Sequence, residues 1–112
     1  MPLIVIGTMT IRPDAIGRFK AIAAPHAART GAEPGCQFFS FAVTDEALGL
    51  VAIAEIWDDE AALQEHHRLA ETAEFVAALN QIRTGRDVRM FDAAEPRPIP
   101  ANLASGASHA PG

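Results

Sequence analysis

The sequence has few of the residues on which several classes of protein depend. Cys36 is the only cysteine in 112 residues, so neither an intramolecular disulfide nor a cysteine-based metal cluster can form within the chain. A lone thiol is typical of the reducing cytoplasm, where we expect the protein to work. Nine basic residues stand against fourteen acidic ones. This balance excludes a nucleic-acid partner, because phosphate backbones are bound by clustered Lys and Arg.

Long hydrophobic stretches are missing as well. The apolar run at residues 3–6 is too short for a signal sequence, lacks a basic patch before it, and is soon followed by Arg12 and Asp14. No segment approaches the roughly 20 consecutive apolar residues of a membrane-spanning helix. We therefore expect no membrane partner.

The chain does contain enough apolar residues for one well-filled core. Hydrophobic residues make up 49% of the sequence, and the length fits a single domain. After Asp92 the composition changes to a stretch rich in Pro, Ala, Ser and Gly with no periodic apolar pattern. We therefore expect a domain at residues 1–92 and a Pro/Ala-rich C-terminal extension at residues 93–112, which a partner subunit is a candidate to hold.

Apolar runs bounded by turn residues predict four strands, and apolar residues at helical spacing predict two helices. The strands are expected at residues 3–11, 36–43, 48–57 and 86–92, and the helices at residues 13–29 and 58–82. Pro25 predicts a kink or a restart near Ala24, and Thr72 is a candidate cap for a second segment of the later helix.

This order, βαββαβ, is the ferredoxin-like α+β arrangement, in which a four-stranded antiparallel sheet carries both helices on one face. The strands at residues 3–11, 36–43 and 48–57 are apolar at successive positions, so both faces of the sheet favour burial. Two helices cover one face only, and the Pro-rich extension brings few large apolar groups to the other. We therefore expect a homodimer in which a second sheet covers the free face.

Several local patterns resemble one family along residues 3–92. The most specific stretches are Glu33-Pro34-Gly35-Cys36, the aromatic strand after it, the segment from Glu55 to Leu63, His66 and Phe75. They are similar to the antibiotic biosynthesis monooxygenases, a family of dimeric α+β barrels that includes cofactor-independent quinol monooxygenases.

The resemblance implies a cavity between sheet and helices and turnover without metal, flavin or haem. The implied substrates are molecular oxygen and a small aromatic molecule of the quinol or polyketide type. Phe39 stands where many relatives have Tyr, and the chain has no Tyr, so no phenol hydroxyl is available there.

Three residues are the main candidates for chemistry. His66, which the resemblance places on the second helix, would act as a base because histidine titrates near neutrality; the alternative is a solvated helical histidine. Trp57 would form a flat wall for an aromatic substrate, or else pack in the core or an interface. Glu55 faces the same side as Trp57 in an otherwise apolar strand, so it is either functional or ion-paired with an arginine such as Arg89.

Other candidates carry weaker signals. Ser40 and Phe39 are expected to contact the substrate, although a buried serine more often bonds the backbone. His26 is expected at the surface, with the mouth of the cavity as the alternative. His67 is also expected at the surface, because it lies about 100° round the helix from His66 and cannot readily share a metal with it. Cys36 has no cationic neighbour in sequence and is expected to be an inert core thiol.

Other activities use the same fold. Haem degradation by some relatives uses an Asn and a His at positions where this chain has Thr8 and Leu79, which argues against it. A non-oxidative isomerase or decarboxylase would also use His66 for proton transfer. A small-molecule-binding stress-response module without turnover is the third alternative.

Overall fold

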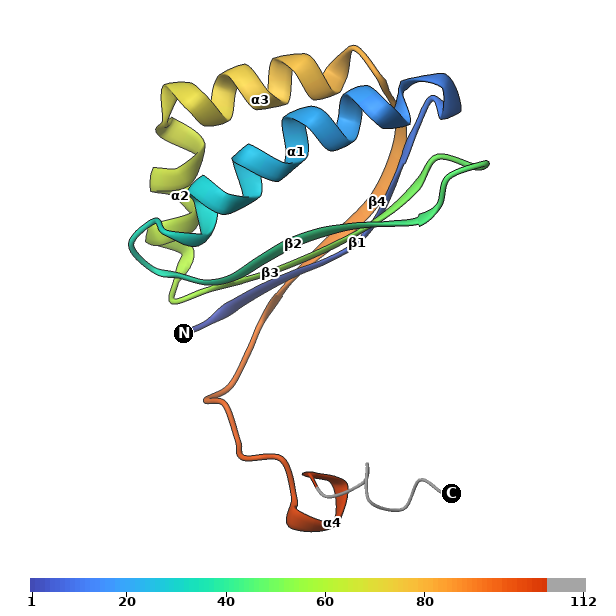
Figure 1. The fold of residues 1–112 in the computed structure, drawn as a ribbon. Coiled ribbons are helices and arrows are strands. Elements are labelled where there is room, and N and C mark those ends of the chain that lie inside the picture. The colour runs from blue at the N-terminus through green and yellow to red at the C-terminus, as the bar shows by residue number, and fades with distance from the viewer. Residues whose placement is uncertain (105–112) are drawn as a thin grey trace.

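The computed structural model describes residues 1–104. One sheet and three main helices make up its body, and a short helix follows (Figure 1). The elements are β1 (Leu3–Ile11), the 3-10 helix η1 (Pro13–Ala15), α1 (Ile16–Gly31), β2 (Cys36–Asp45), β3 (Leu50–Trp57), α2 (Glu60–Arg68), α3 (Ala70–Asn80), β4 (Arg83–Asp92) and α4 (Ala101–Ala104).

The four strands form one antiparallel sheet in the order β2-β3-β1-β4. β2 and β3 are joined as the expected hairpin, and β1 lies in the centre between β3 and β4. In the register, Val5 is opposite Glu55 and Met9 is opposite Val51, while Phe39 is opposite Glu55 on the other side of β3. The predicted ferredoxin-like α+β fold is confirmed.

The helices cover one face of the sheet, which we call the inner face (Figure 1). α1 packs against β2 and α3, and Phe19 of α1 meets Phe41 of β2 edge to face with ring centroids 5.7 Å apart. The core between the layers divides into two clusters. The larger is built around Met9, Phe19 and Val51, and the smaller joins Trp57 to Leu3 and Leu63.

The interruptions of the helices differ from the predictions. α1 runs through Pro25 without a restart. Pro25 cannot donate to the carbonyl of Ala21, but Ala21 is exposed, so water is able to satisfy that carbonyl. The second helical region breaks instead at Leu69, which is extended (φ −69°, ψ 138°), and α3 begins there as a separate helix. Thr72 lies inside α3 and is buried.

The opposite face of the sheet, which we call the outer face, has no helix over it (Figure 1). Ile6 and Phe91, which lie on this face, are each 50% exposed. After β4 the chain leaves the sheet on the side away from α1, α2 and α3 and ends its described part in α4. The predicted C-terminal extension lies partly outside the described residues, which stop at residue 104. No helix in the described part of the chain is long and apolar enough to cross a membrane.

Candidate functional site

A chamber of about 260 Å³ lies between the inner face of the sheet and the helices. All four strands and the three main helices contribute to its lining, which is mostly apolar and aromatic and includes a few polar groups. Phe39, Phe41 and Phe75 form its aromatic wall, and His26, Glu55 and His66 are polar groups at the same wall. Lining residues that are also exposed occur on β4 and at His67, so the chamber opens along that edge of the sheet.

Local structure aims His66 into this chamber. Asp59 caps α2 by accepting a hydrogen bond from the amide of Ala62 at 2.9 Å, as expected for a helix that begins after Asp58 and Asp59. Leu63 and His66 are three residues apart, so they share the face of α2 that turns toward the sheet, and both are buried. The imidazole of His66 is only 4% exposed.

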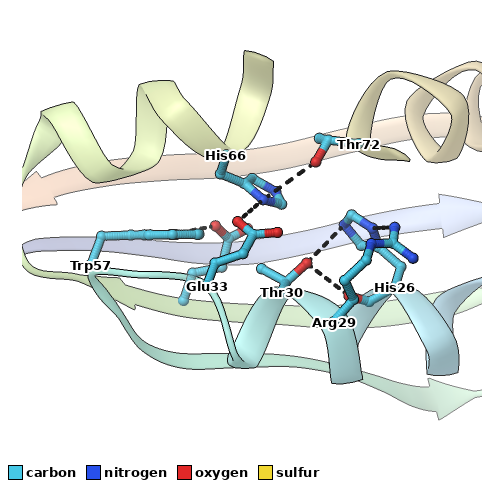
Figure 2. Close-up of polar contacts among 8 residues, drawn as sticks. His26, Arg29, Thr30, Glu33, Trp57, His66 and Thr72 are labelled. Atoms are coloured by element: carbon cyan, nitrogen blue, oxygen red, sulfur yellow. Dashed lines mark hydrogen bonds and ion pairs between the residues drawn. The ribbon is translucent and has the colours of Figure 1, made fainter. Parts of the chain in front are cut away.

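Glu33 holds one side of this imidazole. Its carboxylate Oε1 lies 2.7 Å from Nδ1 of His66, and the Glu33 side chain is 12% exposed (Figure 2). The hydroxyl of Thr72 lies 3.4 Å from the same nitrogen. Three elements thus converge on His66: the loop after α1, α2 itself and the first turn of α3.

A glycine allows that loop to approach α2. Gly35 has φ +82°, and a Cβ atom at this position would lie 2.5 Å from Cβ of Ala62, so a larger residue would push the loop away. The amide of Asp58 also donates a 2.8 Å hydrogen bond to the carbonyl of Gly35. The Glu-Pro-Gly turn therefore fixes Glu33 beside the helix that carries His66.

The Glu33 contact determines which nitrogen of His66 is available for chemistry. A carboxylate only accepts hydrogen bonds, so Nδ1 must carry the hydrogen, and Nε2 keeps its lone pair. Within residues 1–104, no side chain or backbone group forms a hydrogen bond with Nε2. A buried His–carboxylate pair of this kind positions an imidazole to accept a proton through its free nitrogen.

Glu55 is the second acidic group at the chamber. Its Oε1 accepts a hydrogen bond from the indole Nε1 of Trp57 at 2.9 Å. Burial raises the pKa of Glu55, and the hydrogen bond from Trp57 and the charge of His66 oppose that rise. Trp57 is fully buried and does not line the chamber, although its ring centroid is 5.1 Å from that of His66. Trp57 therefore orients Glu55 instead of forming the wall predicted for a substrate.

His26 is buried at 3% exposure, so the expected surface position is wrong. Its ring stacks on Phe75 at 3.8 Å between centroids, with an interplanar angle of 1°. Nδ1 accepts a hydrogen bond from Arg29 at 3.1 Å, and Nε2 lies 3.4 Å from the hydroxyl of Thr30, which itself donates to the carbonyl of His26 (Figure 2). Burial, reinforced by the positive charges of His66 and Arg29, lowers the pKa of His26 to about 4.

The structure brings three of the five predicted site residues to the chamber. Phe39, Glu55 and His66 line it, and Trp57 lies directly behind Glu55. Ser40 does not join them, because it is opposite Ala54 in the register and therefore lies on the outer face.

Other expectations from the sequence have mixed outcomes. The predicted ion pair between Glu55 and Arg89 is not formed; Arg89 lies 3.6 Å from Asp87 instead. His67 is exposed, as predicted, but it also lines the chamber, and partial burial together with His66 lowers its pKa. Cys36 is half-buried, and burial raises its pKa, as expected for an unreactive thiol.

A second cavity also borders the Glu33–His66 pair, beside the loop before β2 and the start of α2. This groove of about 490 Å³ is larger than the chamber and open to solvent. Carboxylates dominate its polar lining, with contributions from Glu33, Asp58, Asp59 and Glu65. It contains no aromatic residue except His66, whereas three phenylalanines line the chamber. We therefore take the chamber, and not this larger groove, as the candidate site.

Two partners of His66 were not found from the sequence. Glu33 is 33 residues away along the chain, and Thr72 was considered only as a helix cap. The only sequence signal for Glu33 is its place directly before Pro34-Gly35, a turn that can bring it to another element. No group of three or more His, Cys, Asp or Glu residues suited to a metal ion occurs in the described part of the chain.

Comparison with known proteins gives a consistent result. The family model described as antibiotic biosynthesis monooxygenase matches residues 2–78. No curated protein matches the sequence significantly.

Several solved structures share the fold. Rv0793 from Mycobacterium tuberculosis has a TM-score of 0.75 at 23% identity, covering 86% of this chain and 98% of that one. A structure named antibiotic biosynthesis monooxygenase has a TM-score of 0.74 at 26% identity, covering 83% and 99%. A conserved protein from Methanosarcina mazei Go1 has a TM-score of 0.75 at 18% identity, covering 84% and 94%.

Proposed function

Because the chain belongs to the antibiotic biosynthesis monooxygenase family, we propose that it is a monooxygenase that oxidises a small, electron-rich phenol or quinol with molecular oxygen and needs no added cofactor. The observation that carries the proposal is the buried pair of Glu33 and His66. Its 2.7 Å contact leaves the second nitrogen of His66 free at a chamber with an aromatic wall.

His66 is the base in this proposal. Triplet oxygen reacts slowly with closed-shell molecules, so the phenol must first lose its proton to become a good electron donor. Nε2 of His66 takes that proton, and the carboxylate of Glu33 stabilises the imidazolium that forms. The pair is 4% and 12% exposed, so this electrostatic stabilisation acts with little screening by water.

The remaining steps take place on the substrate. The phenolate gives one electron to oxygen, and the resulting radical and superoxide combine to form a carbon–oxygen bond. The imidazolium of His66 returns its proton to the peroxide, and loss of water then breaks the oxygen–oxygen bond, leaves a carbonyl group and restores the neutral base. One oxygen atom enters the product, the other leaves in water, and the substrate supplies all four electrons.

The lining of the chamber supports such a substrate. Phe39, Phe41 and Phe75 give a flat apolar surface on which an aromatic ring can pack, and they limit the access of water to reactive intermediates. Glu55, with its raised pKa, stands on the inner face in the same wall as His66 and is able to donate a hydrogen bond when protonated.

Oxygen uptake in the presence of a panel of quinols and hydroxynaphthalenes tests the proposal. With ¹⁸O₂, one labelled atom is expected in each product molecule, and mass spectrometry reads it directly. Uptake without incorporation would mean that the protein is an oxidase. Tight binding with no uptake would favour a binding module, and isomerisation without oxygen would favour a non-oxidative enzyme.

His66→Ala should lower turnover at least tenfold, since a general base contributes roughly 10²–10⁴-fold. Gln64→Ala is a matched control, because Gln64 is exposed on the same helix and its side chain hydrogen-bonds to the exposed Glu60, away from the chamber lining. Circular dichroism should show that both variants fold. Equal turnover by His66→Ala and the native protein would remove His66 from the mechanism.

The homodimer is part of the same proposal. The outer face exposes Ile6, Phe38 and Phe91 at 50%, 49% and 50%, with Ala52 and Ala54 of β3 on the same side of the sheet. A contiguous apolar surface of this kind marks an interaction site. A second copy of the sheet matches it in shape and chemistry, because a two-fold contact is self-complementary.

Phe38→Glu tests this assembly. Phe38 is opposite Ile56 in the register, so the change places a carboxylate without a basic cross-strand partner from each subunit in the interface, and burial of such a charge costs several kcal/mol. We expect the dimer dissociation constant to rise more than a hundredfold, measured by sedimentation equilibrium, with Gln64→Glu as the control for charge alone. A native protein that sediments as a single 11.9 kDa species would contradict the dimer.

A further inference from the structure

We infer that the chamber takes aromatic substrates that carry a carboxylate group. Arg83 and Arg86 bind that group at the mouth of the chamber, which is its opening along β4. The inference rests on the proposed function in one respect: it takes the chamber to be the substrate site. It adds the chemical class of the substrate, which neither the fold nor the family match gives.

The backbone places both arginines on the inner side of the edge strand β4. Arg86 is opposite Met9 and Arg83 is opposite Ile11, and both of those β1 residues are buried under the helices. Both arginines line the chamber, and so does His67 from α2. No further strand covers β4, so these side chains can be reached from solvent.

The positive charge at this mouth is not neutralised by acidic neighbours. The side chain of Arg86 forms no hydrogen bond or ion pair with any residue in the range 1–104, and the only polar side chain bonded to Arg83 there is the neutral amide of Asn80, at 2.6 Å. Arg89 also borders the chamber, but it is opposite Ile6 of the outer face and lies 3.6 Å from Asp87, so it is not counted with them. The mouth thus holds two unpaired arginines of the nine basic residues of a chain whose net charge is −5.

The two arginines also influence one another. Burial lowers the pKa of Arg83, and the positive charge of Arg86 lowers it further. Two guanidinium groups held close together at a partly desolvated site are complementary to an anion. Arginine binds a planar carboxylate through two parallel hydrogen bonds, which fixes the orientation of the ligand as well as its position.

The distance along the sheet fits a small aromatic acid. Glu55 is level with Val5, and Arg86 is level with Met9, four residues further along β1. At about 3.3 Å per residue, these two levels are about 13 Å apart. A volume of about 260 Å³ is at the lower end of ligand cavities, which span roughly 300–1,000 Å³, and it suits one or two fused rings. The carboxylate would then lie at the arginines while the phenol end points toward His66.

A matched pair of redox-inert probes tests the inference independently of turnover. 2-Naphthoate and 2-naphthamide, which carry no phenol hydroxyl, have nearly the same shape and differ in charge. Isothermal titration calorimetry of the full chain should give a dissociation constant at least tenfold lower for the acid. Quenching of the single tryptophan, which lies next to His66, gives a second measurement of the same binding.

Arg83→Gln/Arg86→Gln should reduce the preference for the acid to less than twofold and leave the affinity for the amide within about twofold of the native value. Arg18→Gln/Lys20→Gln is the matched control, because it removes two positive charges from exposed positions on α1 and should keep the full preference. The melting temperature of each variant verifies that it is folded.

The outcomes separate this inference from the proposed function. Equal binding of acid and amide by the native protein, an unchanged preference in the arginine variant, or binding of neither probe would overturn the inference, even if neutral quinols consumed oxygen. A preference for the acid that depends on the arginines would support it, even if no quinol consumed oxygen.

Discussion

The surroundings of His26 on α1 and of His66 on α2 differ sharply, although the two rings lie only 5.5 Å apart between centroids and are equally buried. Arg29 and Thr30, from the same helix as His26, occupy both of its nitrogens. His66 contacts a carboxylate from another segment through one nitrogen, and its other nitrogen has no hydrogen-bond partner within residues 1–104. Burial and proximity to the cavity are therefore shared, and only the hydrogen-bonding partners distinguish the two.

The charge of those partners has opposite consequences. Arg29 donates to His26 and carries a positive charge, so it disfavours protonation of the ring; the pKa of about 4 keeps His26 neutral near pH 7. At His66 the partner is instead the carboxylate of Glu33, 2.7 Å from Nδ1, which can stabilise the positive charge that forms on the ring when it accepts a proton during turnover. His26 is suited to building the wall with Phe75, and His66 is suited to accepting a proton.

The largest effect is expected from removing the charge of Glu33. This change makes the surroundings of His66 more like those of His26, which has no acidic partner in the described part of the chain. Glu33→Gln keeps the size of the side chain and can still accept a hydrogen bond from Nδ1 of His66. It no longer stabilises the imidazolium, so we expect turnover to fall about a hundredfold, within the range that acid–base groups contribute. Steady-state oxygen uptake across pH 5–9 measures the loss.

The control for Glu33→Gln is Glu65→Gln, which removes an exposed carboxylate that also lines the acidic groove. A merely structural role of Glu33 would lower the melting temperature without altering the dependence of turnover on pH. Turnover within threefold of the native value at every pH would show that the carboxylate does not act through His66.

A smaller effect, on stability, is expected for His26. Its pKa is depressed in the folded state, so the unfolded chain binds a proton more readily, and stability falls as the pH drops from about 6.5 toward 4. Between pH 7 and pH 5 this one group should cost about 2 kcal/mol of unfolding free energy. In His26→Gln that part of the acid sensitivity should disappear, while turnover should change less than it does in Glu33→Gln.

Urea denaturation at a fixed protein concentration measures this difference, because an oligomer's stability depends on concentration. Gln64→Ala should retain the native acid sensitivity. If His26→Gln lost stability between pH 7 and pH 5 as steeply as the native protein, His26 would not be the neutral buried group that the structure shows.

The two histidines also show how far the sequence could lead. The strands and their order follow from local apolar runs and turn residues, which is why the βαββαβ order was predictable. The environment of His26 was not, because Pro25 suggested an exposed break, whereas the helix continues and turns His26 inward. His66 was identified through resemblance, but its partner Glu33 was not, since contacts between distant segments leave no spacing pattern in a single sequence.

The break at Leu69 illustrates the same limit. Leu69, which is extended, carries no glycine or proline signal, so no local pattern places the break between α2 and α3 there. Ser40 was assigned to the wrong side because the aromatic strand is apolar on both faces, which hides the period-two alternation that normally tells them apart.

The smallest effect is expected for Glu55, the other acid near His66, because it already accepts a hydrogen bond from the neutral indole of Trp57. Burial raises its pKa, so the folded state favours the protonated form and loses stability as the pH rises past the ordinary value for Glu. Glu55→Gln keeps an acceptor for Trp57 and removes that loss. At pH 7 we expect a rise in melting temperature smaller than the roughly 4–8 °C that 1 kcal/mol produces in a domain of this size. Differential scanning fluorimetry at pH 4 and pH 7 measures this change in melting temperature, with Glu65→Gln as the exposed control. A lower melting temperature for Glu55→Gln than for the native protein at pH 7 would mean that Glu55 is stabilised as a carboxylate. Glu55 would then belong with Glu33 as a charged partner of His66.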